Sequence, residues 1–265
     1  MSLKKILFIL ILNLSWFLIN GQELISITKT ETILNDADAF LGFDNQNNYY
    51  NIKNNVLIKT NQDKIYRYNN LGLGKITKVD FQNPLQIVVF YKNFNTVVLL
   101  DNQLNEIKKI DFNLKPTPVT LEAVALSSQN QIWIYDSITS KIGLYNVNTD
   151  TFKWISTMLV NPIIHYQSDY IHFYWIDTDK TLYKISIYGA IEKINTIPEF
   201  DSILLTENNN CIYQFNNQLF YFNTSSNSNS KLPIDKKIIS NFFFRDGFLS
   251  IFTQNEITNY KIILP

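Results

Sequence analysis

The sequence predicts an all-β fold, a six-bladed β-propeller closed by an N-terminal strand in the last blade. Three observations indicate this fold. Residues that favour strands are abundant, with 19 Phe and 15 Tyr among 265 residues. The chain holds 34 Asn but only 7 Gly and 7 Pro, so asparagine must make many of the turns. A strand motif also recurs six times at intervals of 37 to 46 residues, the length of a four-stranded blade.

The stretch 85–101 shows the repeated unit most clearly. Two runs of β-branched and aromatic residues flank the short break of Lys92, Asn93, Phe94 and Asn95, which predicts a strand, a tight turn and a second strand. Equivalent strands are centred at residues 57, 98, 144, 184, 221 and 260.

Polar breaks divide each copy into strands. The first three copies predict strands at 40–43, 49–52, 56–59 and 64–68, then at 76–81, 85–91, 96–100 and 106–112, then at 121–126, 132–135, 141–147 and 151–156. The next two predict strands at 162–166, 170–176, 181–187 and 190–195, then at 202–206, 211–214, 219–223 and, poorly, 231–233. The polar segment 223–230 is expected to be a flexible loop.

The sixth copy predicts only three strands, at 238–244, 248–252 and 257–263. Segment 23–30 is strand-like, and pairing it beside 257–263 would complete the blade and remove a free sheet edge. Two packed β-sandwiches and an open stack of hairpins remain alternatives. The core residues expected to be buried are Val88, Phe90, Val98, Leu100, Ile134, Tyr135, Phe173, Trp175, Phe243 and Ile251.

The first residues predict export. Lys4 and Lys5 precede the apolar run 6–19, and Gly21 precedes Gln22, so 1–21 is expected to be a cleaved signal peptide and 22–265 a single propeller domain. A membrane anchor is the alternative, but the run is shorter than the roughly 20 residues that a bilayer requires. Cleavage removes two lysines and no acid, leaving a formal charge of −2, which argues against a nucleic-acid partner. We predict a periplasmic protein; secretion is the alternative.

Few residues suggest chemistry. Cys211 is the only cysteine, which excludes an intramolecular disulfide, and is expected to be buried. His165 and His172 fall on consecutive strands, either as metal ligands or, as we favour, as half-buried strand residues. Asp177 and Asp179 are spaced as in calcium loops but lack the glycine and glutamate that complete one. No metal or cofactor is therefore predicted, and no catalytic motif occurs.

A propeller places the turns between its second and third strands on one rim. Those turns are 53–54, 92–95, 136–140, 177–180, 215–217 and 254–255. They carry amides and an exposed aromatic residue but no convergent titratable groups, which favours a non-enzymatic protein-binding module. The candidate binding residues are Lys92, Asn93, Phe94, Asn95, Asp136, Asp177 and Asp179. A propeller enzyme acting on carbohydrates or lactones is the alternative.

The segment 83–107, NPLQIVVFYKNFNTVVLLDNQLNEI, resembles small exported propeller proteins of type IX-secreting bacteria, and KITKVDF before it is similar as well. At least one protein of that group looks like the periplasmic plug of the type IX outer-membrane translocon. The resemblance implies a periplasmic propeller whose partner is an outer-membrane translocon or another envelope complex. It assigns no role to individual residues.

Overall fold

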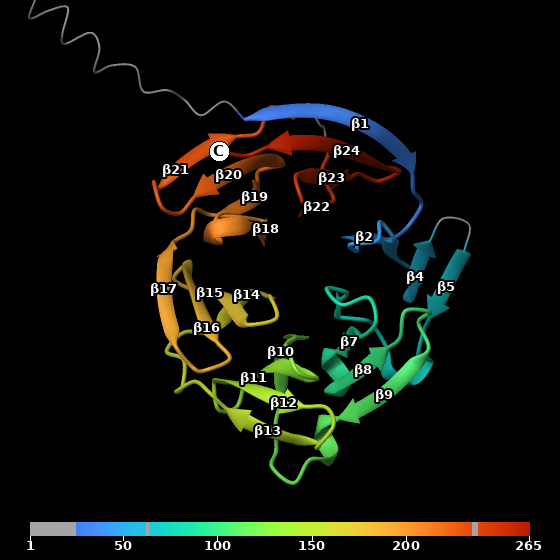
Figure 1. The fold of residues 1–265 in the computed structure, drawn as a ribbon, viewed down its shortest axis with the longest axis vertical. Helices are drawn as coiled ribbons and strands as arrows, with labels where there is room; N and C mark the ends of the chain where they lie inside the picture. Colours follow the sequence, from blue (N-terminus) through green and yellow to red (C-terminus); the bar gives the residue numbers. More distant parts are fainter. Residues whose placement is uncertain (1–24, 62–63, 235–237) are drawn as a thin grey trace, which may run out of the picture.

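The computed structural model describes residues 25–61, 64–234 and 238–265. It shows six four-stranded antiparallel sheets arranged as blades around an open centre (Figure 1), which confirms the predicted fold. The predicted signal peptide lies outside the described residues. Within the described part of the chain, no helix has the length and hydropathy needed to cross a membrane.

Blades 1 to 5 each run in chain order from an inner strand to an outer strand. Blade 1 comprises β2 (Ala39–Phe43), β3 (Tyr49–Lys53), β4 (Val56–Asn61) and β5 (Lys64–Tyr68). Blade 2 comprises β6 (Lys78–Asp80), β7 (Ile87–Tyr91), β8 (Thr96–Leu100) and β9 (Glu106–Asp111). Blade 3 comprises β10 (Leu121–Leu126), β11 (Gln131–Asp136), β12 (Lys141–Asn146) and β13 (Thr151–Trp154).

The remaining blades follow the same plan. Blade 4 comprises β14 (Ile163–Ser168), β15 (His172–Asp177), β16 (Thr181–Ser186) and β17 (Ile191–Thr196). Blade 5 comprises β18 (Ser202–Leu205), β19 (Cys211–Phe215), β20 (Gln218–Asn223) and β21 (Ser228–Lys231). Blade 6 comprises β22 (Asn241–Arg245), β23 (Phe248–Phe252), β24 (Glu256–Ile263) and, from the N-terminal side of the chain, β1 (Ser26–Leu34). Among the described residues, four short 3-10 helices lie in connections: η1 (Leu71–Leu73), η2 (Lys92–Phe94), η3 (Phe112–Leu114) and η4 (Glu207–Asn209).

The ring is closed by β1, as predicted. This strand pairs antiparallel with β24, from Ser26 opposite Ile263 to Leu34 opposite Glu256, and forms the outside of blade 6 (Figure 1). A register shift between Lys29 and Glu31 marks a bulge. The strand extends four residues beyond the predicted 23–30 because the polar residues after Thr30 find partners along β24.

Several predicted strand boundaries differ from the structure by two or three residues, such as 238–244, where β22 is Asn241–Arg245. Two of the differences have a clear physical reason. Leu85 lies in the connection between β6 and β7 and is exposed, because Asn83 begins a turn by accepting a hydrogen bond from the Leu85 N–H at 3.0 Å. The outer strand of blade 5 is Ser228–Lys231 rather than 231–233. Its polar residues pair with β20 through the backbone, so a polar segment that predicts a loop instead begins with a turn and continues as a strand.

The apolar core lies between neighbouring blades. Nine of the ten predicted core residues are buried. Phe243 is the exception and is half-buried, because it sits on the inner strand β22. Its ring packs over Gly42 of blade 1, where a Cβ atom would come within 2.5 Å of the ring. Gly42 also has a φ of 137°, so this position requires glycine for both space and backbone conformation.

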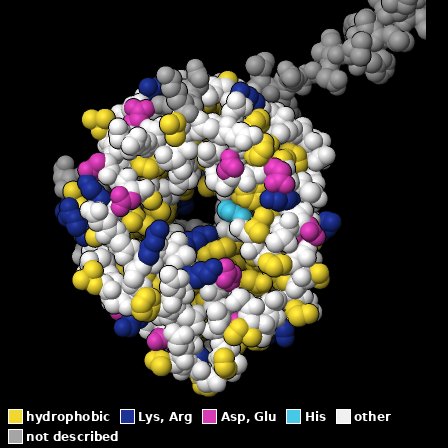
Figure 2. All heavy atoms as spheres, turned by 180° about the vertical axis from the view of Figure 1, so that it is seen from behind, with side chains coloured by type: hydrophobic (Ala, Val, Ile, Leu, Met, Phe, Trp, Pro, Cys, Tyr) yellow, Lys and Arg dark blue, Asp and Glu magenta, His cyan; other side chains and the backbone are white. Residues whose placement is uncertain are grey.

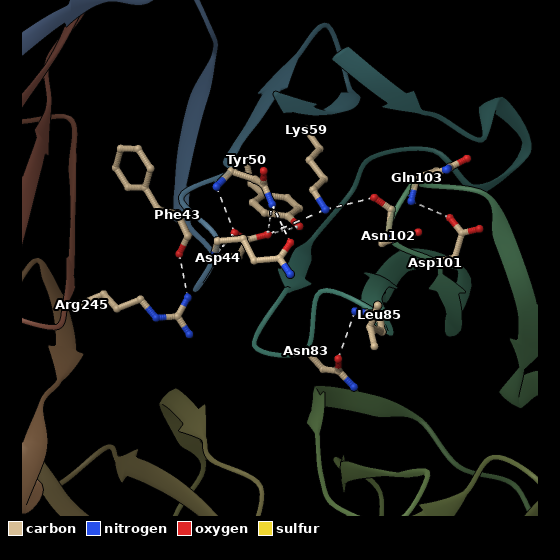
Figure 3. Close-up of polar contacts among 12 residues, drawn as sticks. Phe43, Asp44, Tyr50, Lys59, Asn83, Leu85, Asp101, Asn102, Gln103 and Arg245 are labelled. Atoms are coloured by element: carbon tan, nitrogen blue, oxygen red, sulfur yellow. Dashed lines mark hydrogen bonds and ion pairs between the residues drawn. The ribbon is translucent and has the colours of Figure 1, made fainter. Parts of the chain in front are cut away.

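A buried polar network joins blades 1 and 2 (Figure 3). Asp44 accepts hydrogen bonds from Asn48 Nδ2 at 2.8 Å and Tyr50 OH at 3.0 Å. Lys59 Nζ lies 3.8 Å from Asp44 Oδ2 and donates to the Asn102 carbonyl at 3.0 Å. Burial opposes ionisation of Asp44, but its hydrogen bonds outweigh this effect and hold its pKa below the usual value. Burial lowers the pKa of Lys59, partly offset by Asp44.

Candidate functional site

The propeller has two faces with different loops. Because the strands of a blade alternate in direction, the turns between second and third strands share a face with the connections between blades. We call this the upper face. The turns between first and second strands and between third and fourth strands form the other, the lower face.

The turn formed by η2 on the upper face contains four of the predicted binding residues. Lys92, Asn93 and Phe94 are exposed, and the Phe94 side chain is 45% exposed beside Gly74. Asn95 is buried, with a φ of 50°. Its Nδ2 donates to the Val119 carbonyl at 2.7 Å, and its Oδ1 accepts from another backbone N–H of the next blade. Asn95 therefore joins blades 2 and 3, and its side chain is not available to a binding protein.

The predicted aspartates also include both buried and exposed side chains. Asp136 is fully buried and accepts hydrogen bonds from the Thr120 N–H at 2.8 Å and the Thr139 hydroxyl at 2.7 Å. Asp177 is also buried and accepts from the Thr181 N–H at 2.9 Å. Both carboxylates hold turns, so the expectation that they lie on an accessible rim was wrong. Asp179 is exposed.

Exposed apolar side chains are the feature of the upper face that sequence reasoning missed. They lie at or near turns and at five of the six connections between blades. We define the upper apolar set as Leu34, Leu71, Phe94, Leu114, Ile138, Met158, Val160, Phe215 and Ile238. Val160 is 95% exposed and Leu71 is 90% exposed. Phe94 is one of the predicted binding residues. The members at connections between blades lie in segments with no strand pattern, outside the second-to-third turns from which the binding residues were predicted.

The channel wall contains a polar cluster. Lys78 on β6 donates to the Tyr166 carbonyl on β14 at 2.9 Å, and its Nζ lies 3.5 Å from the centre of the Tyr166 ring. These contacts run from blade 2 to blade 4, past the inner strand of blade 3. Burial lowers the pKa of Lys78 to about 8, because a desolvated ammonium group is disfavoured. Figure 2 shows basic, acidic and histidine side chains around the channel opening.

Other contacts of this cluster satisfy the free inner edge of β10. The Leu126 N–H donates to Asp80 Oδ2 at 2.8 Å, and the Leu126 carbonyl accepts from the Ser168 hydroxyl at 3.1 Å. The Val124 N–H approaches the Tyr166 hydroxyl at 3.4 Å. An inner edge strand would otherwise expose unpaired backbone groups to the channel. The cluster therefore has a structural role, because Asp80, Tyr166 and Ser168 provide hydrogen-bond partners for the backbone of this edge.

The two histidines do not form a metal site. His165 lies opposite Ile176, which is four residues from His172 along β15, or about 13 Å at the usual strand rise. His172 Nδ1 pairs with Asp169 Oδ2 at 3.2 Å. His165 Nε2 is buried without a hydrogen-bond partner, and burial, followed by repulsion from Lys78, lowers its pKa to about 3. The residues that the structure describes contain no cluster of three metal-ligating side chains.

Cys211 is buried at the start of β19, as expected. Burial raises the pKa of its thiol to about 12. A thiol in this environment stays protonated at neutral pH and is unsuited to act as a nucleophile.

The fold and loops therefore define a β-propeller with exposed apolar side chains at five of its six upper-face connections between blades. Comparison with family models and with curated proteins finds no match. Among solved structures, virginiamycin B lyase from Staphylococcus aureus is 12% identical, with a TM-score of 0.60, covering 91% of this chain and 100% of the lyase. A DUF4221 family member from Bacteroides vulgatus is 11% identical, with a TM-score of 0.55, covering 92% of this chain and 99% of that protein.

YCF48 bound to a D1 peptide is a further similar structure, at 11% identity and a TM-score of 0.54, covering 83% of this chain and 78% of YCF48. Similarity at these identities shows the shared propeller fold alone, since one fold carries many functions.

Proposed function

We propose that this chain is a non-enzymatic, periplasmic protein-binding module whose upper face contacts an outer-membrane partner. The observation that carries the proposal is the upper apolar set. Large exposed apolar side chains also occur on the lower face, among them Tyr188 and Phe248, but those of the upper set lie at five of the six connections between blades. Exposed apolar surface is typical of a protein-interaction site. Charged and amide groups such as Lys92, Asn93 and Asp179 would supply the polar rim of such an interface.

We further propose that the partner is the type IX secretion translocon, which the propeller plugs from the periplasm. The resemblance of 83–107 to exported propellers of type IX-secreting bacteria supports this partner. The signal-peptide pattern of 1–21 supports the compartment. A mature formal charge of −2 disfavours a nucleic-acid partner.

A pull-down from the native envelope tests both parts of the proposal. The Leu71→Asp, Val160→Asp double variant is compared with Tyr188→Asp, which changes a lower-face residue that is 87% exposed. All three side chains are exposed, so both variants are expected to melt like the natural protein. We expect the double variant to recover the partner at least about tenfold less well, which corresponds to about 1.4 kcal/mol.

The possible outcomes distinguish the binding module, its upper face and the translocon plug from one another. Near-stoichiometric recovery of a translocon component, lost only in the double variant, supports the plug. Recovery of a different envelope protein keeps the binding module and refutes the plug. Equal recovery by both variants refutes the assignment to the upper face, and recovery of the propeller alone refutes the module.

A propeller enzyme acting on carbohydrates or lactones is the second candidate, favoured by the displaced pKa values of Lys78 and His165 in the channel wall. Turnover of p-nitrophenyl glycosides or dihydrocoumarin that is lost in Lys78→Met would support it. Absence of turnover with the purified natural protein would remove this support.

A further inference from the structure

The lower face contains a groove between blades 2 and 3 that the proposed function does not use. Its volume is about 580 Å³, within the range of sites that hold ligands. Blade 2 contributes the loop between β6 and β7 together with part of β8 and β9, and blade 3 contributes two loops. The lining residues are Asn83, Leu85, Gln86, Leu99, Ile107, Lys108, Asn130, Val147 and Asn148.

The groove has apolar walls and an apolar floor. Leu85 is 66% exposed and Ile107 is 57% exposed, whereas Leu99 and Val147 are buried members of the core between the two blades. The pairing of β8 with β9 shifts register between Leu99 and Leu100, which leaves Ile107 as the bulge residue. A bulge redirects a side chain and often lies beside a functional site. The backbone irregularity here turns an isoleucine outward at the groove.

The polar lining consists almost entirely of amides. Among the described residues, the side-chain amides of Gln86, Asn130 and Asn148 and the Nδ2 group of Asn83 have no hydrogen-bond partner. Each full amide offers both donors and an acceptor. Lys108 is the one charged lining residue, and its Nζ already donates to the Val147 carbonyl.

We propose that this groove binds an extended, uncharged peptide segment that inserts an aliphatic side chain between Leu85 and Ile107. A peptide backbone presents alternating donors and acceptors, which the open amides match. The buried floor of Leu99 and Val147 suits an aliphatic anchor, and no aromatic ring lines the groove to stack on a sugar. The near absence of available charge disfavours an acidic or basic ligand. The site lies on the face opposite the upper apolar set and is independent of it.

Selection of a heptapeptide phage library on the natural protein tests the proposal. A selected peptide, synthesised with a fluorescein label, is then titrated by fluorescence polarisation against variants. We expect a consensus with a central Leu, Ile or Val and no charged residue. Leu85→Asp and Ile107→Asp should each weaken binding at least tenfold. Leu114→Asp changes an upper-face residue that is 81% exposed and should bind like the natural protein.

Conservative variants test the amides separately from the fold. Asn83→Asp keeps the acceptor for the Leu85 N–H and removes the Nδ2 donor, and Gln86→Met keeps the shape of the side chain. Each should weaken binding three- to tenfold with an unchanged melting temperature. Selection of no binder, a charged consensus, or equal binding by the Leu85 and Leu114 variants would overturn the proposal. Binding of a glycan array that is lost in Leu85→Asp would also overturn it in favour of an oligosaccharide site.

Discussion

The turns of the upper face and the groove of the lower face use polar residues differently. On the upper face, the turn residues Asn95, Asp136 and Asp177 are buried and hold the backbone, while apolar side chains project outward. On the lower face, amides in the groove of blades 2 and 3 remain open. The difference shows that a polar residue in a turn is often held by the backbone of the turn and is then not offered to a partner. The polar side chains that are available to a partner can therefore be identified only after the hydrogen bonds within the turns are known.

The lower face shows the same principle within one repeated turn. Asp44 begins the sequence DNQNN and Asp101 begins DNQLN, and each carboxylate accepts hydrogen bonds from the backbone N–H groups two and four residues later. Asp44 is buried and faces Lys59, whereas Asp101 is half-buried. Identical local hydrogen bonding thus occurs in two different environments.

The two faces form only when the ring is closed, so removing β1 should have the largest effect on stability. The joint between blades 6 and 1 has a small core around Phe40, Phe252 and Ile257. Deleting residues 22–34 should therefore abolish cooperative unfolding, since it exposes β24 as a free edge. Deleting 1–21 alone is the control and should leave the melting curve unchanged. A cooperative melt at the natural temperature after the longer deletion would contradict the closure.

The repeated lower-face turn should give the next largest effect. Asp44→Ala should lower the free energy of unfolding by about 3–5 kcal/mol, because it removes the ion-pair partner of the buried Lys59 ammonium and leaves only the weaker interaction with Asp101. Asp101→Ala removes the same local hydrogen bonds and should cost about 1 kcal/mol. Urea titration of both variants measures the difference, and equal costs would show that burial is not decisive.

The upper-face aspartates should differ by a smaller amount. Asp136→Ala should lower the free energy of unfolding by about 3 kcal/mol, since it leaves the Thr120 N–H and the Thr139 hydroxyl without their acceptor. The exposed Asp179→Ala should cost about 0.5 kcal/mol or less. Thermal or urea unfolding distinguishes them. A destabilised Asp179 variant would mean that both acids are structural.

The fold was predictable from the sequence because a repeat of about forty residues survives in every blade. The signal for closure was an unpaired strand pattern at the start of a chain whose last copy lacks a strand. The site was less predictable, since polar residues such as Asn95 look accessible in a turn until their backbone partners are known. Apolar residues outside strand patterns, such as Val160, could have been noted from the sequence. That they lie on the same face is known only once the blades are arranged in a ring.

The channel wall belongs to neither face and should respond to pH. His165 has a folded-state pKa of about 3, below its ordinary value of 6.5. At pH 7 both states are neutral, and below 6.5 the unfolded state binds a proton that the folded state rejects. Stability should therefore fall progressively as the pH drops from 6.5 to 3. His165→Phe should remove that share of the loss, whereas His172→Gln should retain it. Identical pH profiles for the two variants would contradict this assignment.

Site-specific photocrosslinking in intact cells tests whether the upper face contacts the proposed partner. Benzoylphenylalanine is placed at Leu71 or Val160 on the upper face and at Tyr188 on the lower face of blade 4, away from the groove of blades 2 and 3. All three positions are at least 87% exposed, so label accessibility is matched. We expect a crosslink to one outer-membrane protein from both upper positions and none from Tyr188. Crosslinking to that protein from Tyr188 alone would contradict this expectation.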